Sequence, residues 1–178
     1  MSDVEYLKSL LGVHPDFPKK GITFLDIFPI LQNPIAFETL ITHIVHHILI
    51  THPTPPDIIV GLDARGFLLG PMIASRLKTS FVPVRKGGKL PGETENVTYD
   101  KEYGKDVFEI QKGSVGKGSR CLVIDDLIAT GGSAAAAGQL IEKSGGVTIE
   151  YIFIISLPFL KGEEKLNAPC YSLIQAED

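Results

Sequence analysis

The feature that most constrains this chain is an apolar run that leads directly into an acidic pair, a glycine turn and a helix. Residues 120–137 read RCLVIDDLIATGGSAAAA. The run at residues 121–124 has the length and branched character of a fully buried strand. A loop at residues 127–132 follows the two carboxylates, and small residues from Ser133 onward predict a helix. Such a strand–turn–helix unit is typical of α/β folds.

The residues of this turn indicate what it can bind. A loop that enters a helix presents unpaired N–H groups and the positive end of the helix dipole, and both favour a phosphate. The glycine pair at 131–132 lets the backbone approach an anion closely, and Thr130 and Ser133 add hydroxyl donors. Asp125 and Asp126 would repel phosphate but suit hydroxyl groups or a magnesium ion. A phosphate beside two hydroxyls is the pattern of ribose 5-phosphate.

Competing nucleotide motifs do not fit this stretch. A P-loop has a lysine after its glycines, whereas Ser133 and Ala134 stand there. The dinucleotide fingerprint has three glycines spaced G-x-G-x-x-G, whereas this loop has an adjacent pair. The remaining alternative is an ordinary strand-to-helix turn that happens to be acidic.

Composition limits the class of protein. The 178 residues, 44% hydrophobic and 21% charged, fit a single globular domain spanning residues 1–178. A net charge of −4 gives no general attraction to nucleic acid or to an anionic membrane. Cys121 and Cys170 lack metal-ligand spacing, the N-terminus is no signal peptide, and no apolar run approaches the roughly 20 residues of a membrane span. We therefore expect a cytoplasmic protein.

Alternation of strands and helices predicts a doubly wound, mostly parallel sheet flanked by helices. Ligands bind such sheets at the carboxyl ends of the strands, where Asp63, Arg85 and Asp125 fall. The expected strands are residues 57–62, 80–85, 121–124, 147–155 and an edge strand near 171–174, and the expected helices are 3–12, 34–52, 67–77 and 134–143.

A second strand end carries a charged turn before a helix. Asp63, Ala64, Arg65 and Gly66 follow the strand at residues 57–62. Backbone N–H groups there could hold a second anion, and Arg65 could add a charge-assisted contact. Alternatively, Asp63 caps the helix and Arg65 is solvated.

Two further segments add charge. The basic loop, residues 86–92 (KGGKLPG), carries cations among glycines and is either a solvated turn or an anion clamp. Residues 93–112 read as a hairpin with a flexible tip, a lid that excludes water during reaction. Composition does not distinguish Glu102 from Glu93, Glu95 or Glu109 as an acid/base group.

The N-terminal segment 13–33 is rich in both prolines and apolar residues. It is either a loop packed on the core or a hood over a ligand, with Phe24 as an aromatic face for a flat base. The histidines of residues 43–52 lie beside an apolar helical stripe and lack an H-E-x-x-H arrangement, so we expect no metal there.

The motif V-I-D-D-L-I-A-T-G-G-S at residues 123–133 resembles the phosphoribosyl pyrophosphate (PRPP) signature of the type I phosphoribosyltransferases. The strings R-K-x-G-K-L-P-G, E-Y-G-K and F-x-D-I make the chain similar to the adenine-using members of that family. The resemblance runs from about residue 17 to residue 173 and therefore covers nearly the whole chain.

The resemblance implies a purine-salvage transferase that converts adenine and PRPP to AMP and pyrophosphate, assisted by Mg²⁺, through an oxocarbenium-like transition state. It also implies a type I phosphoribosyltransferase fold with a hood (13–33), a basic loop and lid (85–112) and a PRPP motif (121–138). A homodimer is implied as well, in which a basic loop residue reaches the neighbour's site.

The resemblance also assigns residue roles. Glu102 would accept the proton of the attacking base, and Arg65 and Arg85 would stabilise the leaving pyrophosphate. Leu25 stands where the family often has a basic residue. Asp125 and Asp126 would hold the metal, mainly through ligand and water. Adenine would meet Thr23, Phe24, Leu25 and Leu127, and PRPP or AMP would meet Asp63, Ala64, Arg65, Lys89, Tyr103, Asp125, Asp126, Ala129, Thr130, Gly131, Gly132 and Ser133.

Three alternatives stay open at this point. A sibling enzyme could use hypoxanthine, guanine or orotate on the same PRPP platform. A non-catalytic PRPP sensor would keep the acidic pair and the glycines but need no lid. An unrelated flavodoxin-like domain would bind a nucleotide without turnover.

Overall fold

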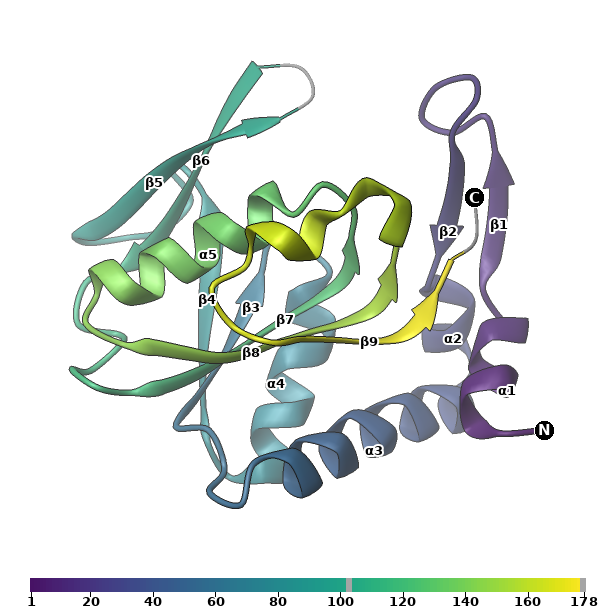
Figure 1. The fold of residues 1–178 in the computed structure, drawn as a ribbon. Helices are drawn as coiled ribbons and strands as arrows, with labels where there is room; N and C mark the ends of the chain where they lie inside the picture. Colours follow the sequence, from purple (N-terminus) through teal and green to yellow (C-terminus); the bar gives the residue numbers. More distant parts are fainter. Residues whose placement is uncertain (102–103, 177–178) are drawn as a thin grey trace. The chain divides into compact units, whose positions relative to one another are not determined.

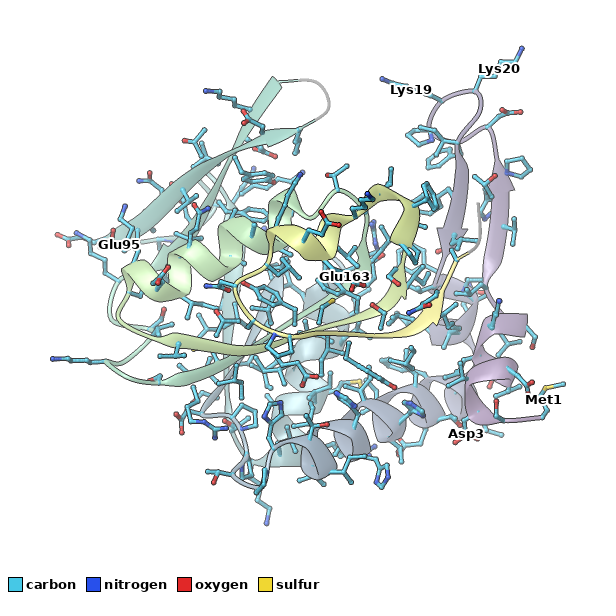
Figure 2. All side chains as sticks on the ribbon, viewed as in Figure 1. Met1, Asp3, Lys19, Lys20, Glu95 and Glu163 are labelled. Carbon is cyan, nitrogen blue, oxygen red and sulfur yellow. The ribbon has the colours of Figure 1, made fainter. Side chains whose placement is uncertain are left out.

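The computed structural model describes residues 1–101 and 104–176 and divides into two compact units, Met1–Thr51 and His52–Asp178 (Figure 1). The first unit holds three helices and an antiparallel hairpin, which forms where the sequence predicted an irregular segment. Lys19 and Lys20 lie at the tip of that hairpin (Figure 2). The elements of this unit are α1 (Asp3–Ser9), β1 (Gly12–Pro15), β2 (Thr23–Asp26), α2 (Phe28–Gln32) and α3 (Pro34–Thr51).

Helix α3 is long and apolar enough to cross a membrane by length and composition alone, which the sequence analysis did not anticipate. Its residues are arranged as in an amphipathic helix, because one face is buried while Glu38 and His46 on the other are exposed. Burial lowers the pKa of His43 within this helix. The buried face consists of Ala36, Leu40, Ile41, Ile44 and Ile48.

The second unit is built on a seven-stranded sheet of order β5-β6-β4-β3-β7-β8-β9. The strands from β4 to β9 pair in parallel, and β6 and β5 add antiparallel at one edge, so the predicted mostly parallel sheet is confirmed. Helix α5 covers one face and α4 lies on the other (Figure 1). The elements are β3 (Ile58–Leu62), α4 (Gly66–Leu77), β4 (Ser80–Lys86), β5 (Thr94–Lys101), β6 (Gly104–Gln111), β7 (Arg120–Ile128), α5 (Gly132–Lys143), β8 (Val147–Ser156), β9 (Cys170–Gln175) and the 3₁₀ helices η1 (Pro158–Leu160) and η2 (Gly162–Lys165).

Small residues allow α5 to pack closely on the sheet. A Cβ atom at Gly138 would lie 1.9 Å from the hydroxyl of Tyr151, which donates to Asn167 at 2.7 Å. Strand β3 is buried along its whole length, and β8 is buried from Glu150 onward, as expected for strands covered on both faces. Burial raises the pKa of the Cys121 thiol and of the Tyr151 hydroxyl, each to about 12.

Strand β7 is longer than predicted. The sequence placed its end at residue 124, whereas pairing with β8 continues to Ile128, which lies opposite Ser156. Asp125 and Asp126 are therefore strand residues, and the true turn is short. This places the acidic pair within the rigid sheet rather than on a loop.

The predicted hairpin over residues 93–112 is confirmed as β5 and β6, and its tip residues 102–103 lie outside the described part. Strand β5 is braced along α5 at both ends of that helix. The Lys143 ammonium lies 3.3 Å from the carboxylate of Glu95, a residue labelled in Figure 2, and donates to the Asn96 carbonyl at 3.2 Å. At the other end, a Cβ atom at Gly132 would lie 3.1 Å from the Asp100 carbonyl oxygen.

Candidate functional site

The carboxyl ends of β3 and β7 surround a cavity of about 420 Å³. The cavity lies at the edge of the sheet that the strand–helix alternation predicted. It brings together residues that are up to 90 positions apart in the chain, from Asp63 to Phe153. Its lining comprises Asp63, Ala64, Arg65, Lys86, Tyr99, Lys101, Phe108, Asp125, Asp126, Leu127, Ile128, Ala129, Thr130, Gly131, Gly132, Ser133, Ala134 and Phe153.

One wall is the glycine loop, residues 129–133, which enters α5. Gly131 has φ of +79° and occupies the N-cap of the helix, a backbone conformation that suits glycine. A Cβ atom there would lie 2.2 Å from the carbonyl oxygen of Gly162 in η2. The loop is therefore fixed from behind, and the first residues of α5 border the cavity. This geometry suits an anion at a helix N-terminus.

The floor of the cavity carries the acidic pair of β7. Asp126 is buried and accepts from Nε of Arg65, while its own N–H donates to Oδ1 of Asp125 at 2.9 Å. Burial and the adjacent charge of Asp126 raise the pKa of the Asp125 carboxyl well above its ordinary value. Arg65 neutralises one carboxylate, and Asp125 remains directed to the ligand space as a hydrogen-bond acceptor.

The turn between β3 and α4 forms the opposite wall. Asp63, Ala64 and Arg65 line it, and the peptide bond between Asp63 and Ala64 is cis. Asp63 does not cap α4 through its side chain; it accepts from Nε of Arg85 at 3.2 Å. The alternative of a capping Asp63 beside a solvated Arg65 is therefore wrong, because both side chains are engaged across the site.

Arg85 and Lys89 are not among the described residues that line this cavity. Arg85 donates to the Lys89 carbonyl at 3.3 Å, and its guanidinium carbon lies 5.9 Å from the centre of the Phe67 ring. The Gly88 N–H donates to the Glu109 carboxylate at 3.1 Å. The basic loop is thus tethered at the rim, and the roles predicted for Arg85 and Lys89 stay predictions.

Lys86 of the basic loop also lines the cavity, together with Tyr99 and Lys101, two residues that the sequence patterns did not indicate as ligand contacts. The hydroxyl of Tyr99 donates to the Asp106 carboxylate of β6 at 3.5 Å, and Lys101 pairs with the same carboxylate. A signal for the last two existed, since residues two apart on a strand share a face. The sequence does not indicate which face of β5 lies against α5.

The remaining predicted residues lie elsewhere. Glu102 and Tyr103 fall outside the described residues. Thr23, Phe24 and Leu25 lie on β2 of the first unit, where the Phe24 ring meets Phe17 edge-on at 5.3 Å between centroids. In the second unit, Leu127 lines the cavity, and its predicted contact with adenine stays a prediction.

The donor set fits a magnesium ion that is shared with a phosphorylated ligand. Within residues 1–101 and 104–176, no group of three or more His, Cys, Asp or Glu side chains is placed to hold a metal by itself. Asp125 and Asp126 are two oxygen donors beside a roomy cavity, one of them already paired with Arg65. Mg²⁺ characteristically binds through one or two carboxylates together with water and substrate phosphates.

The fold and this edge of the sheet define a class. The mostly parallel sheet carries an acidic pair, a glycine loop and a second turn whose side chains are hydrogen-bonded across the site. This arrangement is the one expected of an enzyme that acts on a phosphorylated sugar. In agreement, the phosphoribosyl transferase domain family matches residues 30–177. The chain therefore belongs to the phosphoribosyltransferase family.

Its relatives place it more narrowly within that family. It is 53% identical over 173 residues to an adenine phosphoribosyltransferase of Yarrowia lipolytica, covering 97% of this chain and 95% of the relative. The adenine phosphoribosyltransferase of Saccharomyces cerevisiae, solved with adenine and an imino-altritol bisphosphate, superposes with a TM-score of 0.95 at 50% identity, covering 96% and 98% of the two chains. The Trypanosoma brucei enzyme, solved with AMP, pyrophosphate and ribose-5-phosphate, gives 0.89 at 31% identity, covering 97% and 79%. The chain thus groups with the adenine phosphoribosyltransferases.

Proposed function

We propose that this chain transfers the 5-phosphoribosyl group of PRPP to adenine, forming AMP and releasing pyrophosphate in purine salvage. The observation that carries the proposal is a single cavity lined by the acidic pair, the glycine loop and the turn at Asp63–Arg65. These features match the three parts of PRPP. The chemistry of each feature indicates which part of PRPP it binds.

The glycine loop holds the 5-phosphate. Its backbone N–H groups and the hydroxyls of Thr130 and Ser133 act where α5 begins, at the positive end of the helix dipole. This contact is remote from the bond that breaks. Binding energy gained there therefore orients the ribose for reaction at C1.

Asp125 and Asp126 accept hydrogen bonds from the ribose hydroxyls. Because positive charge develops on the ribose as the bond from C1 to pyrophosphate breaks, nearby carboxylates also stabilise that state. Magnesium, when bound by the pair with ligand oxygens and water, supplies positive charge to the phosphates of PRPP. The Arg65–Asp126 pair keeps one carboxylate fixed in orientation.

The departing pyrophosphate lies beside the turn of Ala64 and Arg65, with the basic loop closing over it. Lys86 already lines the cavity, Arg85 precedes it on β4, and Lys89 follows it on the basic loop. Cations and backbone N–H groups there compensate the charge that grows on the leaving group. We include Lys86 in this set, beside the residues that the resemblance implied.

In this proposal the adenine ring stacks on Phe24, with the backbone of Thr23 and Leu25 at its edge, and Leu127 is a further predicted contact. The ring nitrogen attacks C1 and releases a proton, which Glu102 accepts. General-base catalysis of this kind contributes roughly 10²- to 10⁴-fold in rate. Exchange of Glu102 for alanine should therefore lower kcat by about that factor while the Kd of PRPP stays within about twofold of wild type. Unchanged turnover would remove that role.

We further propose that the active form is a cytoplasmic homodimer in which the basic loop reaches the neighbouring site. A PRPP-binding regulator without turnover is the alternative of a different class. It is distinguished by pyrophosphate release.

The deciding experiment measures pyrophosphate release from PRPP and Mg²⁺ with adenine, hypoxanthine, guanine or orotate in turn. We expect release with adenine alone. Release with another base would keep the transfer chemistry and change the specificity. Binding of PRPP without release would make the chain a regulator and leave Glu102 without a function.

A further inference from the structure

The space in front of the glycine loop is closed on its far side by the end of β5. A cavity of about 310 Å³ lies between them, lined by Tyr99, Asp100, Lys101, Ala129, Thr130, Gly132 and Ser133. Among the described residues of this lining, Lys101 is the one cation. Lys101 also lines the larger cavity beside the acidic pair. An anion on the glycine loop would thus face this ammonium group.

Lys101 is engaged by a carboxylate in the free protein. Its ammonium group pairs with Asp106 on the adjacent strand β6, and the two side chains are 44% and 25% exposed. The hydrogen bond between them raises the pKa of Lys101 and lowers the pKa of Asp106, so both are charged at neutral pH. The positive charge of Lys86, another cavity residue, also acts on Asp106. The carboxylate forms its ion pair with Lys101.

The glycine loop lacks a charge to match its proposed ligand. Its donors are neutral N–H and hydroxyl groups, whereas a phosphate monoester carries close to two negative charges at neutral pH. Arg65, a cation of the opposite wall, is bound to Asp126. The acidic pair adds further negative charge to the same cavity. A cation on the open side of the loop would offset this repulsion.

We propose that Lys101 is the cation of the 5-phosphate subsite, held by Asp106 in the free protein and transferred to the phosphate when the glycine loop is occupied. The proposal rests on the proposed function, because it takes the loop to be the 5-phosphate site. Asp106 is then a placeholder whose oxygens offer Lys101 the same contact that phosphate oxygens later provide. Tyr99 lines the same cavity as Lys101 and shares its partner, since the Tyr99 hydroxyl donates to Oδ2 of Asp106 at 3.5 Å. The flexible stem of lysine allows the ammonium group to turn without movement of the strand.

The test uses ligands that carry one end of PRPP at a time. Calorimetry on the full-length protein compares the Kd of ribose 5-phosphate with that of pyrophosphate and Mg²⁺ in wild type, Lys101→Met and Lys112→Met. Lys112 is the matched control, because it forms an exposed 3.2 Å ion pair with Glu93 on the same hairpin and lines neither cavity. We expect Lys101→Met to weaken ribose 5-phosphate about tenfold, the loss of one charged hydrogen bond, and to leave pyrophosphate unchanged. Lys101→Arg should restore most of the affinity.

If Asp106 holds Lys101 only until a phosphate binds, removal of the Asp106 charge should strengthen ribose 5-phosphate binding. A purely structural ion pair would not have this effect. Asp106→Asn keeps the acceptor for the Val107 N–H but removes the competing charge, so it should tighten ribose 5-phosphate about threefold. That gain should vanish in the double variant with Lys101→Met. Unchanged ribose 5-phosphate affinity in Lys101→Met, or an equal loss for pyrophosphate, would overturn the proposal, as would weaker binding in Asp106→Asn. If the proposed function fails, wild type makes no AMP, yet the ribose 5-phosphate measurement still reports on Lys101.

Discussion

The glycine loop and the basic loop belong to the same proposed site but are held in opposite ways. The glycine loop is buried at Gly131, supported by the backbone of Gly162 and contacted by β5 at Gly132. The basic loop is exposed at residues 86–89 and is tied at Gly88 by the Glu109 carboxylate. The first is built to be in place before the ligand arrives, and the second can adjust to it. In the proposed reaction the phosphate that stays bound meets the rigid loop, and the group that must leave meets the adaptable one.

The largest effect that separates the two loops should come from adding one methyl group to each. Gly131→Ala places a Cβ 2.2 Å from a backbone oxygen, so the loop must shift. We expect roughly 100-fold weaker PRPP binding and a Tm lower by about 5 °C, since overpacking costs about 1–3 kcal/mol. Gly88 has a similar φ of +77° but meets nothing within 4 Å. Gly88→Ala should therefore change the Kd of PRPP by no more than about threefold.

These two variants would be compared by thermal unfolding and by PRPP titration under the same conditions. Equal damage in both would show that positive φ alone decides the cost. The contrast between a rigid loop and an adaptable loop would then be wrong.

A second expected effect is a change in the pH dependence of stability, and it comes from Asp125, which lies on β7 at the base of the cavity. The raised pKa of Asp125 means that the folded state holds this proton more tightly than the unfolded chain does. The folded state is therefore penalised above the raised pKa, and stability is regained as the pH falls through that value toward the ordinary pKa of aspartate. Asp125→Asn keeps the acceptor for the Asp126 N–H and removes the charge.

We expect Asp125→Asn to have a higher free energy of unfolding at pH 7 and a weaker dependence of that free energy on pH in the acidic range. Its kcat/KM should fall about 100-fold, because charged hydrogen bonds to the ribose are lost. Urea unfolding from pH 5 to pH 8 measures the first effect, with Asp100→Asn on the exposed strand end as control. A less stable Asp125→Asn variant would contradict the assigned direction of the pKa shift.

Features that depend on local sequence could be predicted, whereas features that depend on contacts between distant segments could not. The strand that leads into the acidic pair and the helix after the glycines follow from local patterns of burial, charge and glycine, and both are present, although the strand continues to Ile128. Contacts between distant segments escaped prediction: Gly162 behind Gly131, Arg65 on Asp126, and β5 along α5. Each depends on which face a strand or turn presents after the sheet has assembled. A single sequence contains no local signal for that choice, so Tyr99 and Lys101 were missed.

The smallest effect tests the tether of the basic loop. The Glu109 carboxylate accepts from the Gly88 N–H, but its negative charge also opposes an anion bound there. Glu109→Gln keeps an acceptor and removes the charge, whereas Glu109→Met removes both. We expect Glu109→Gln to bind pyrophosphate and Mg²⁺ about twofold more tightly, the size typical of an exposed charge interaction. Glu109→Met should lose that gain, because the freed loop must be ordered when the ligand binds. Calorimetric titration of both variants separates charge from tether, and equal affinity in the two would show that the basic loop needs no tether.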